Sequence, residues 1–386
     1  MFHWLQLAVA ALALLGVAYY LLCLWSAASF LLARRRSRAV NGEAAFTPAV
    51  TILKPVLGAD PGAYESFRSH CLQDYPQYEI IFGVGDANDA AVPLIQQLMR
   101  EFPQRQIKLV VCAQKRGMNR KVSNLLQMLP QARHQYLLVN DGDIRVRPDY
   151  LRRVMAPFAG DRVGMVTCLY HGIAASTLGS KLEALGISTD FSAGVLTARQ
   201  VEGGIRFALG STLAFSREAL DSVGGLEPLV DYLADDYQLG RRISAQGYKV
   251  LLADVNVETF VPGYSFREFF LHQLRWARST RDSRRWGYTG LVLTFGLPWS
   301  MMSAVLAHGT LWSWRVLAAA LGTRLLMALT VGVGVLRDRQ VWRDLVLIPL
   351  RDLIAVVVWA TSFLGHQVSW RGTSFILENG KLRPAA

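Results

Sequence analysis

Apolar residues gather in long runs at the two ends of this 386-residue chain. From Leu5 to Ala33 no residue is charged, and this run is longer than the ~20 apolar residues that a helix needs to cross a bilayer. Arginines follow at once, at positions 34, 35, 36 and 38. A cleaved signal peptide carries its positive charge before a shorter apolar core. The pattern therefore predicts a permanent anchor, residues 1–33, with its amino terminus outside, and a basic juxtamembrane linker, residues 34–47, in the cytoplasm.

Three more apolar runs lie near the carboxyl end, and they predict about three transmembrane helices within residues 291–366: Leu291–Trp312, Val316–Leu336 and Leu345–Leu364. The loop Arg337–Arg343 contains three arginines, which assigns it to the cytoplasm. Arg351 and Asp352 in the last run are costly in lipid, so they must pair, face other helices or lie at an interface. An odd number of crossings would leave the tail, residues 367–386, outside.

Between the apolar ends, residues 48–258 alternate short β-branched runs with longer amphipathic stretches. The runs predict strands at Ala49–Leu53, Glu79–Val84, Ile107–Cys112, Tyr136–Asn140 and Val163–Leu169. Such alternation indicates βαβ units, and hence an α/β domain whose mostly parallel sheet is covered by helices on both faces. Ligands of open sheets of this kind bind beyond the carboxyl ends of the strands, so the residues there are the first candidates for chemistry.

Composition and charge narrow the function classes. Hydrophobic residues make up 52% of the chain, which fits a protein that is partly soluble and partly in a membrane. The net charge of +12 favours an anionic partner: a lipid surface, a nucleotide diphosphate or nucleic acid. The four cysteines lack CxxC spacing, which argues against a zinc site, a disulfide framework and redox chemistry.

Acidic residues follow two of the predicted strands. Asp86 follows the second, and Asp141 and Asp143 flank Gly142 after the fourth. Two carboxylates in a tight turn can bind a hard cation and a ribose hydroxyl together. A simple turn is the alternative, since Asp-Gly is a strong turn signal.

Two further segments have both a functional and a structural interpretation. Lys115–Lys121 places four cations around a glycine before an amphipathic helix, which suits a diphosphate but equally a solvated loop. The adjacent Asp235 and Asp236 start a predicted helix, where they either favour its dipole or supply a general base.

Residues 259–290 mix aromatic and basic side chains, as an amphipathic helix in a lipid headgroup layer does. The aromatic members are Phe266, Phe269, Phe270, Trp276 and Trp286, and the basic ones are Arg267, Arg275, Arg278, Arg281, Arg284 and Arg285. Nucleic acid would tolerate the same mixture, but the membrane segments argue against that partner.

In this order, the motifs resemble the ceramide glucosyltransferase group, glycosyltransferase family 21, over nearly the whole chain. They are a strand-end Asp86, the DxD of Asp141 and Asp143, the pair Asp235-Asp236 and the Arg-Trp motif Arg275-Trp276, between membrane segments. Further similar stretches are Val50–Pro55, Gly224–Leu226, Ala234–Tyr237 and Val368–Gly372. The resemblance implies a GT-A catalytic domain at residues 48–258, in the cytoplasm and attached to a bacterial inner membrane.

One position departs from the family pattern. His272 stands three residues before the Arg-Trp pair, where the family usually has Gln or Arg. With Trp286–Tyr288 and Thr294–Pro298, this is more similar to the bacterial branch that glycosylates hopanoid lipids than to the animal ceramide enzymes. The resemblance therefore leaves ceramide and hopanoid both open as acceptors.

The family resemblance also implies roles for the site residues. A UDP-sugar is the donor, and Mg²⁺ or Mn²⁺ is the cofactor, held by Asp143 with Asp141 nearby. Asp86 contacts the nucleotide, and Arg275 assists the departing diphosphate. Nucleotide-sugar contacts also fall to Asp141, Lys121 and His272.

For the acceptor side the resemblance makes Asp236 the general base, with Asp235 as its supporting neighbour. A single base without a nucleophilic carboxylate predicts inversion, from an α-linked donor to a β-glycoside. Trp276 is either a stacking platform for a sugar or lipid or an anchor at the membrane interface.

Two other functions stay open. A processive polysaccharide synthase shares these motifs but needs a channel through many helices, and about four are predicted here. A non-catalytic protein that binds or flips glycolipids would need the membrane segments but not a base. The sequence does not indicate an oligomeric state.

Overall fold

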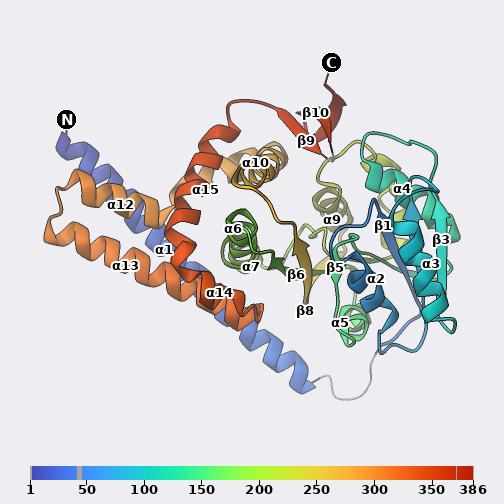
Figure 1. Ribbon diagram of the computed structural model, residues 1–386. Helices are drawn as coiled ribbons and strands as arrows, with labels where there is room; N and C mark the ends of the chain where they lie inside the picture. The colour runs from blue at the N-terminus through green and yellow to red at the C-terminus, as the bar shows by residue number, and fades with distance from the viewer. Residues whose placement is uncertain (1, 41–45, 371, 386) are drawn as a thin grey trace. The chain divides into compact units, whose positions relative to one another are not determined.

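The computed structural model describes residues 2–40, 46–370 and 372–385, which form two compact units (Figure 1). We call the first the sheet unit: Ser37–Ile173, Gly204–Pro262 and Gly380–Ala386. We call the second the helical unit: Met1–Arg36, Ala174–Gly203 and Gly263–Asn379. Residues 41–45 of the predicted basic linker lie outside the described residues.

The sheet unit is built on a sheet with the strand order β3-β2-β1-β4-β7-β6-β8-β5. In chain order the strands are β1 Val50–Val56, β2 Tyr78–Val84, β3 Gln106–Val111, β4 Tyr136–Val139, β5 Ile144–Arg145, β6 Val163–Ala174, β7 Leu213–Ser216 and β8 Lys249–Val261. The helices around them are α2 Ala63–Cys71, α3 Ala91–Glu101, α4 Arg120–Met128, α5 Tyr150–Met155, α8 Arg217–Asp221 and α9 Asp235–Ala245. The last strand of the chain, β11 Lys381–Pro384, also belongs to this unit.

One half of the sheet is parallel, as the sequence predicts. β1 pairs in parallel with β2 and β4, with Val50 opposite both Tyr78 and Tyr136, and β2 pairs in parallel with β3. In the other half, β7 runs antiparallel to β4 and β6, and β5 antiparallel to β8. The α/β class and the five predicted strands are confirmed, while the antiparallel half was not predicted.

Helices cover both faces of the parallel half. Phe82 on β2 meets the ring of Phe67 on α2 at 5.2 Å between centroids. The next residue, Gly83, faces Met128 of α4 so closely that a Cβ on Gly83 would lie 2.3 Å from its sulfur. Successive residues of a strand point to opposite faces, so α2 and α4 cover opposite faces of the sheet.

The helical unit contains most of the apolar runs. Its helices are α1 Phe2–Val40, α6 Leu178–Gly186, α7 Ser192–Val201, α10 Phe266–Ser283, α11 Arg285–Thr289, α12 Gly296–Leu306, α13 Leu311–Ala328, α14 Gln340–Asp344 and α15 Ile348–Ser362. A π-helix, Ile187–Phe191, joins α6 to α7, and a second one, Leu329–Val335, extends α13. Strands β9 Gln367–Trp370 and β10 Thr373–Glu378 pair antiparallel.

Three helices of the described chain are long and apolar enough to cross a membrane: His3–Arg35, Leu311–Val335 and Gln340–Ser362. A fourth candidate is the pair Arg285–Thr294 and Gly296–Leu306, which is bent by 48°. The first of these helices does not stop at the basic residues but runs to Val40, through the start of the predicted linker.

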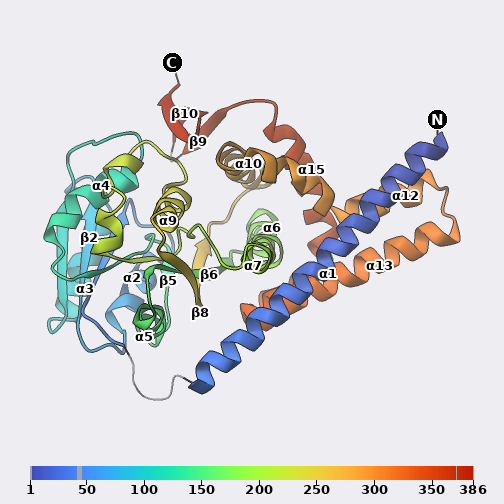
Figure 2. The ribbon, with the colours of Figure 1, turned by 180° about the vertical axis from the view of Figure 1, so that it is seen from behind.

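Helices α1, α12 and α13 lie side by side (Figures 1 and 2). Near the start of α1, Gln6 Nε2 donates to the carbonyl oxygen of Leu306 at the end of α12 (2.6 Å). Further along, Leu297 N of α12 donates to the hydroxyl of Tyr20 (3.0 Å). Near the end of α1, Arg34 Nη1 donates to Val335 O (3.3 Å). α12 therefore runs antiparallel to α1, and α13 with its extension runs parallel to it.

The charged residues inside the apolar helices are paired, as their cost in lipid requires. Arg324 of α13 is buried and donates two hydrogen bonds to Asp352 of α15, both at 2.9 Å, and one to Asp190 at 2.6 Å. The neighbouring Arg351 donates to Gln273 of α10 (3.0 Å).

A close helix crossing at Gly16 can be tested by substitution. A Cβ on Gly16 would lie 2.1 Å from Cα of Gly296, so Gly16→Ala must separate the two backbones. We expect a loss of about 1–3 kcal/mol of stability, measured as a lower thermal midpoint in detergent. Gly322→Ala on α13 is the matched control, because no atom lies within 4 Å of its added Cβ. An equal effect of both substitutions would contradict this packing.

Candidate active site

The predicted site residues of the sheet unit lie at the carboxyl edge of its parallel strands. Asp86 follows β2, Asp141 and Asp143 follow β4, and Lys121 lies in the first turn of α4 after β3. Parallel strands end at the same edge, so these segments lie along one edge of the sheet, as predicted.

Lys121 connects the two acidic motifs. Its Nζ lies 2.8 Å from Asp141 Oδ1 of the DxD and 3.4 Å from Asp235 Oδ2 of the acidic pair. Burial lowers the pKa of Lys121, but the carboxylates of Asp141, Asp235 and Asp236 outweigh it and raise this pKa above its ordinary value. Lys121 therefore stays charged and joins segments that are more than ninety residues apart in the chain.

Asp236 occupies the first turn of α9, where its Oδ1 accepts a hydrogen bond from Tyr237 N (2.7 Å). A Cβ on Gly210 would lie 3.1 Å from Asp236 Oδ2 and 3.6 Å from Asp141 Oδ2, so both carboxylates border the same small space. Burial, and then the charge of Asp235, raises the pKa of Asp236 to about 6, against the influence of Lys121. A carboxylate with this pKa is ionised at neutral pH and can accept a proton.

Asp143 and Asp141 are the candidate metal ligands. The hydroxyl of Thr259 on β8 donates to Asp143 Oδ2, and burial followed by the charge of Asp141 raises the pKa of Asp143. A divalent cation would relieve this repulsion. Among the residues that the structure describes, no group of three His, Cys, Asp or Glu side chains could hold a metal. Two carboxylates nevertheless fit Mg²⁺ or Mn²⁺ when diphosphate oxygens and water supply the other ligands.

Lys54 is a site residue that the sequence analysis missed. It is fully buried in the middle of β1, and its Nζ donates to the carbonyl oxygen of Asp141 (2.9 Å). Burial lowers the pKa of Lys54 to about 7, although the carboxylates of Asp143 and Asp141 oppose the shift. The available signal was a single charged residue inside an otherwise uncharged strand, because a buried charge is costly without a partner.

Asn119 is a second residue that was missed. Its side-chain oxygen caps α4 by accepting from Val122 N (3.1 Å). Its Nδ2 donates to Tyr232 O (2.7 Å) and to Asp235 Oδ1 (3.3 Å). Asn119 thus fixes the helix that carries Lys121 to the loop that precedes the acidic pair. An Asn just before an amphipathic helix is a cap signal that the sequence did contain.

Asp86 is exposed in the turn after β2, where its Oδ1 accepts from Asn88 N (2.8 Å). It lies at the same strand edge as the other acids, and among the described residues it forms no ion pair with Lys121. Its predicted contact with a nucleotide stays a prediction.

His272, Arg275 and Trp276 lie on α10 of the helical unit. His272 Nδ1 lies 3.2 Å from Oε1 of the buried Glu183, and its ring stacks on Tyr264 with 5.4 Å between centroids. Trp276 contacts the rings of His272 and Phe191. The roles predicted for these three side chains at a donor site stay predictions.

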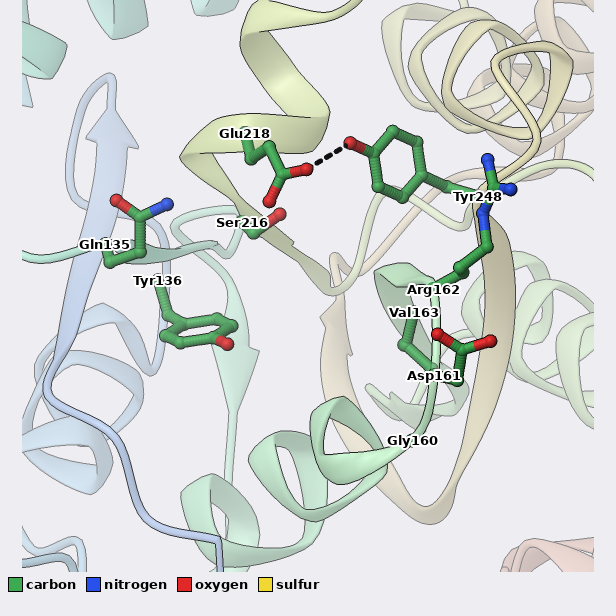
Figure 3. A pocket seen from close by; sticks show the side chains of 9 residues that line it. All are labelled: Gln135, Tyr136, Gly160, Asp161, Arg162, Val163, Ser216, Glu218 and Tyr248. Carbon is green, nitrogen blue, oxygen red and sulfur yellow. Dashed lines mark hydrogen bonds between the residues drawn. The ribbon is translucent and has the colours of Figure 1, made fainter.

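A pocket with a volume of about 410 Å³ lies elsewhere in the sheet unit (Figure 3). Its lining includes Tyr136 at the start of β4 and Ser216 at the end of the antiparallel β7, and Tyr248 donates to Glu218 beside it (2.8 Å). These positions mark the opposite strand edge from the acidic motifs. The pocket therefore does not coincide with the candidate site.

Comparisons with known protein sequences point to one family. The profile of the family described as "Glycosyl transferase family 21" matches residues 8–383. Ceramide glucosyltransferase 3 of Caenorhabditis elegans is 26% identical over 232 residues, which are 60% of this chain and 50% of that protein. Beta-monoglucosyldiacylglycerol synthase of Synechocystis sp. is 28% identical over 182 residues, 47% of this chain and 37% of that protein. The chain thus spans half or less of the length of these relatives.

Among solved structures, the chain is similar to the mannosyltransferase PcManGT from Pyrobaculum calidifontis in complex with GDP-Man and Mn²⁺. The two chains are 18% identical with a TM-score of 0.48, and the match covers 90% of this chain and 98% of that one.

The role of Asn119 as a connector can be measured. We expect Asn119→Ala to cost about 1–2 kcal/mol, since it removes the helix cap and two hydrogen bonds, one to Tyr232 in the loop before α9 and one to Asp235 at the start of α9. The measurement is the thermal midpoint of the full chain in detergent. Asn119→Ser should recover part of the loss, because serine keeps the cap. Asn88→Ala, at an exposed position, should leave the midpoint unchanged.

Proposed function

The chain belongs to glycosyl transferase family 21, and from this membership we propose that it transfers a hexose or N-acetylhexosamine from a UDP-sugar to a hydroxyl group of a membrane lipid, with inversion. The acceptor is a lipid of the ceramide or hopanoid type. The active domain is on the cytoplasmic side of a bacterial inner membrane.

The observation that carries this proposal is the ion pairing of Lys121 with Asp141 and Asp235. This pairing brings together an acidic pair that can supply a general base and a DxD that can bind a cation. Both lie at the strand edge where α/β sheets bind ligands. The raised pKa of the buried Asp236 beside this cluster supports a general base, which a protein that only binds or flips glycolipids does not need.

On the leaving-group side, negative charge develops on the diphosphate as the anomeric bond breaks. Asp143 and Asp141 would hold a divalent cation, which supplies positive charge to the diphosphate oxygens. Lys121 supplies a positive charge at this edge and is a candidate diphosphate contact beside the DxD. Arg275 is proposed to assist the departing diphosphate, and Asp86 to contact the uracil.

On the acceptor side, Asp236 removes the proton of the lipid hydroxyl as its oxygen attacks the anomeric carbon. The hydroxyl oxygen forms the new glycosidic bond, the bond to the diphosphate breaks, and the proton stays on Asp236. Attack from the face opposite the leaving group inverts the anomeric configuration. Lys121 and Asn119 hold Asp235 in place. Asp235 in turn helps to position Asp236, and its charge raises the pKa of Asp236.

The lipid acceptor is supported by the apolar helices and by the names of the relatives. Ceramide and diacylglycerol appear in the names of the two relatives described above, and both are lipids with a free hydroxyl. Trp276 on α10 is a candidate platform for the sugar or the lipid. His272 is a candidate contact of the donor.

The test follows UDP release by the purified full chain in detergent. UDP-glucose and UDP-N-acetylglucosamine are offered with ceramide, diacylglycerol or a polyhydroxylated hopanoid, with Mn²⁺ or with EDTA. We expect release that requires one of these lipids and stops with EDTA. Release without any lipid would instead favour a polysaccharide synthase, and no release with any donor would favour a binding protein.

Substitution of the base separates catalysis from binding. We expect Asp236→Asn to lower kcat by about 10²–10⁴-fold while the KM for the UDP-sugar changes little. Asp254→Asn on β8 is a control carboxylate outside the cluster. Full activity of Asp236→Asn would show that the base has been assigned to the wrong residue.

The pH dependence follows from the same carboxylate. Asp236 must be ionised to accept a proton, so kcat/KM should fall about tenfold per pH unit below about pH 6, instead of near the ordinary aspartate value. Lys121 lowers this pKa, whereas Asp235 and Asp141 raise it. Lys121→Met should therefore move the acid limb to higher pH. An acid limb that stays in place would contradict the coupling between the two side chains.

A further inference from the structure

The end of the chain lies against the loop that precedes the acidic pair. Within the sheet unit, Leu382 N of β11 donates to Asp231 O (2.7 Å), and Leu233 N donates to Gly380 O (3.1 Å). Tyr232 pairs with Lys381 as an antiparallel bridge. The side chain of Leu382 is 2% exposed. β11 therefore binds this loop through its backbone, and the buried side chain of Leu382 anchors the strand.

Two residues of the basic segment Lys115–Lys121 also bind this part of the chain. Met118 N donates to Asp231 Oδ1 (3.0 Å), and Asn119 N donates to Val230 O (2.7 Å). The loop ends at Ala234, and α9 begins with Asp235 and Asp236. Its conformation therefore sets where the two carboxylates enter the site.

We propose that β11 is a positioning element that clamps loop 231–234 and so places the acidic pair, and that the chain returns to the sheet unit's side of the membrane to do so. The effect of β11 on catalysis by the acidic pair rests on the function proposed above. The membrane topology does not depend on that function.

The helical unit supplies the topology. The chain enters the sheet unit where α1 ends, and Arg34 near that end contacts Val335. At the other end of α1, Gln6 contacts Leu306. The loop after Leu306 is therefore on the side of the amino terminus, so the bent pair 285–306 crosses the membrane away from the sheet unit's side. α13 and its extension then cross back.

After these two crossings, residues 336–343 are already on the sheet unit's side, which agrees with the three arginines in this loop. Since β11 is held by the sheet unit, Gln340–Ser362 cannot cross, although it is long and apolar enough. Its own features agree: Arg351 of α15 bonds to the amphipathic α10, and α15 runs obliquely to α1 and α13 (Figures 1 and 2). The proposed topology thus has two later crossings, where the sequence predicted about three.

Leu382→Asp tests the clamp. A charge at this buried position should detach β11, and we expect kcat to fall at least about tenfold while the KM for the UDP-sugar changes less than about twofold. Leu382→Met should restore kcat, since it keeps an apolar side chain of similar size. A chain that ends at Pro384 is the matched control. If Leu382→Asp does not fold, a chain that ends at Asn379 replaces it.

A purely structural role would lower the yield of folded protein and leave kcat per folded molecule unchanged, which would overturn the positioning role. If the unaltered chain shows no lipid-dependent UDP release, the proposed function fails. The topology is then still tested by the labelling experiment below.

Cysteine labelling measures the topology in sealed vesicles of one orientation. The four native cysteines are buried, so an impermeant maleimide reports mainly on an introduced one. We introduce Gln104→Cys in the sheet unit, Thr310→Cys after α12 and Ala385→Cys after β11, each in the full chain. Ala385→Cys should react from the same side as Gln104→Cys, and Thr310→Cys from the opposite side. Ala385→Cys and Thr310→Cys reacting from one side would overturn the proposal.

Discussion

The ammonium group of Lys121 holds the site together, because it binds carboxylates from two segments of the chain that do not share a strand or a helix. Asp141 follows β4 and Asp235 begins α9, and each lies within 3.4 Å of this one nitrogen. Burying carboxylates is costly unless a cation compensates them, so the position of α4 constrains both acidic motifs at once. Asn119, two residues earlier at the N-cap of α4, adds a hydrogen bond to the loop before α9 and one to Asp235 itself.

The same principle recurs in the apolar part of the molecule. Arg324 is buried inside α13, and the carboxylates of Asp352 and Asp190 compensate its charge from two other segments. Removing one partner from such a group leaves an uncompensated charge, which is far more costly than the group itself is stabilising. The helices of this unit are therefore held together by the hydrogen bonds of Arg324 and by the close approach of Gly16 and Gly296.

The family was readable from the order of the motifs, and the α/β class from the alternation of strands and helices. Asp141 after a strand and Lys121 at the start of a helix were proposed from the local pattern, because parallel strands end at one edge and the helices that follow begin there. Lys54 and Asn119 were missed, since their importance comes from Asp141 O, Tyr232 O and Asp235, which lie far away in sequence. His272 was noticed only as a departure from a pattern, and its neighbours Glu183 and Tyr264 appear only in the fold.

The sequence alone determined what periodicity and composition encode: the apolar helices, the parallel strands, the acidic motifs and the net charge. These depend on neighbours along the chain, because a helix or a strand displays its apolar face at a fixed spacing. Tertiary structure alone decided which charges meet and to which unit each segment belongs. The return of β11 to the loop before Asp235 is such a decision, because a backbone hydrogen bond between Leu382 and Asp231 leaves no trace in the identity of either side chain.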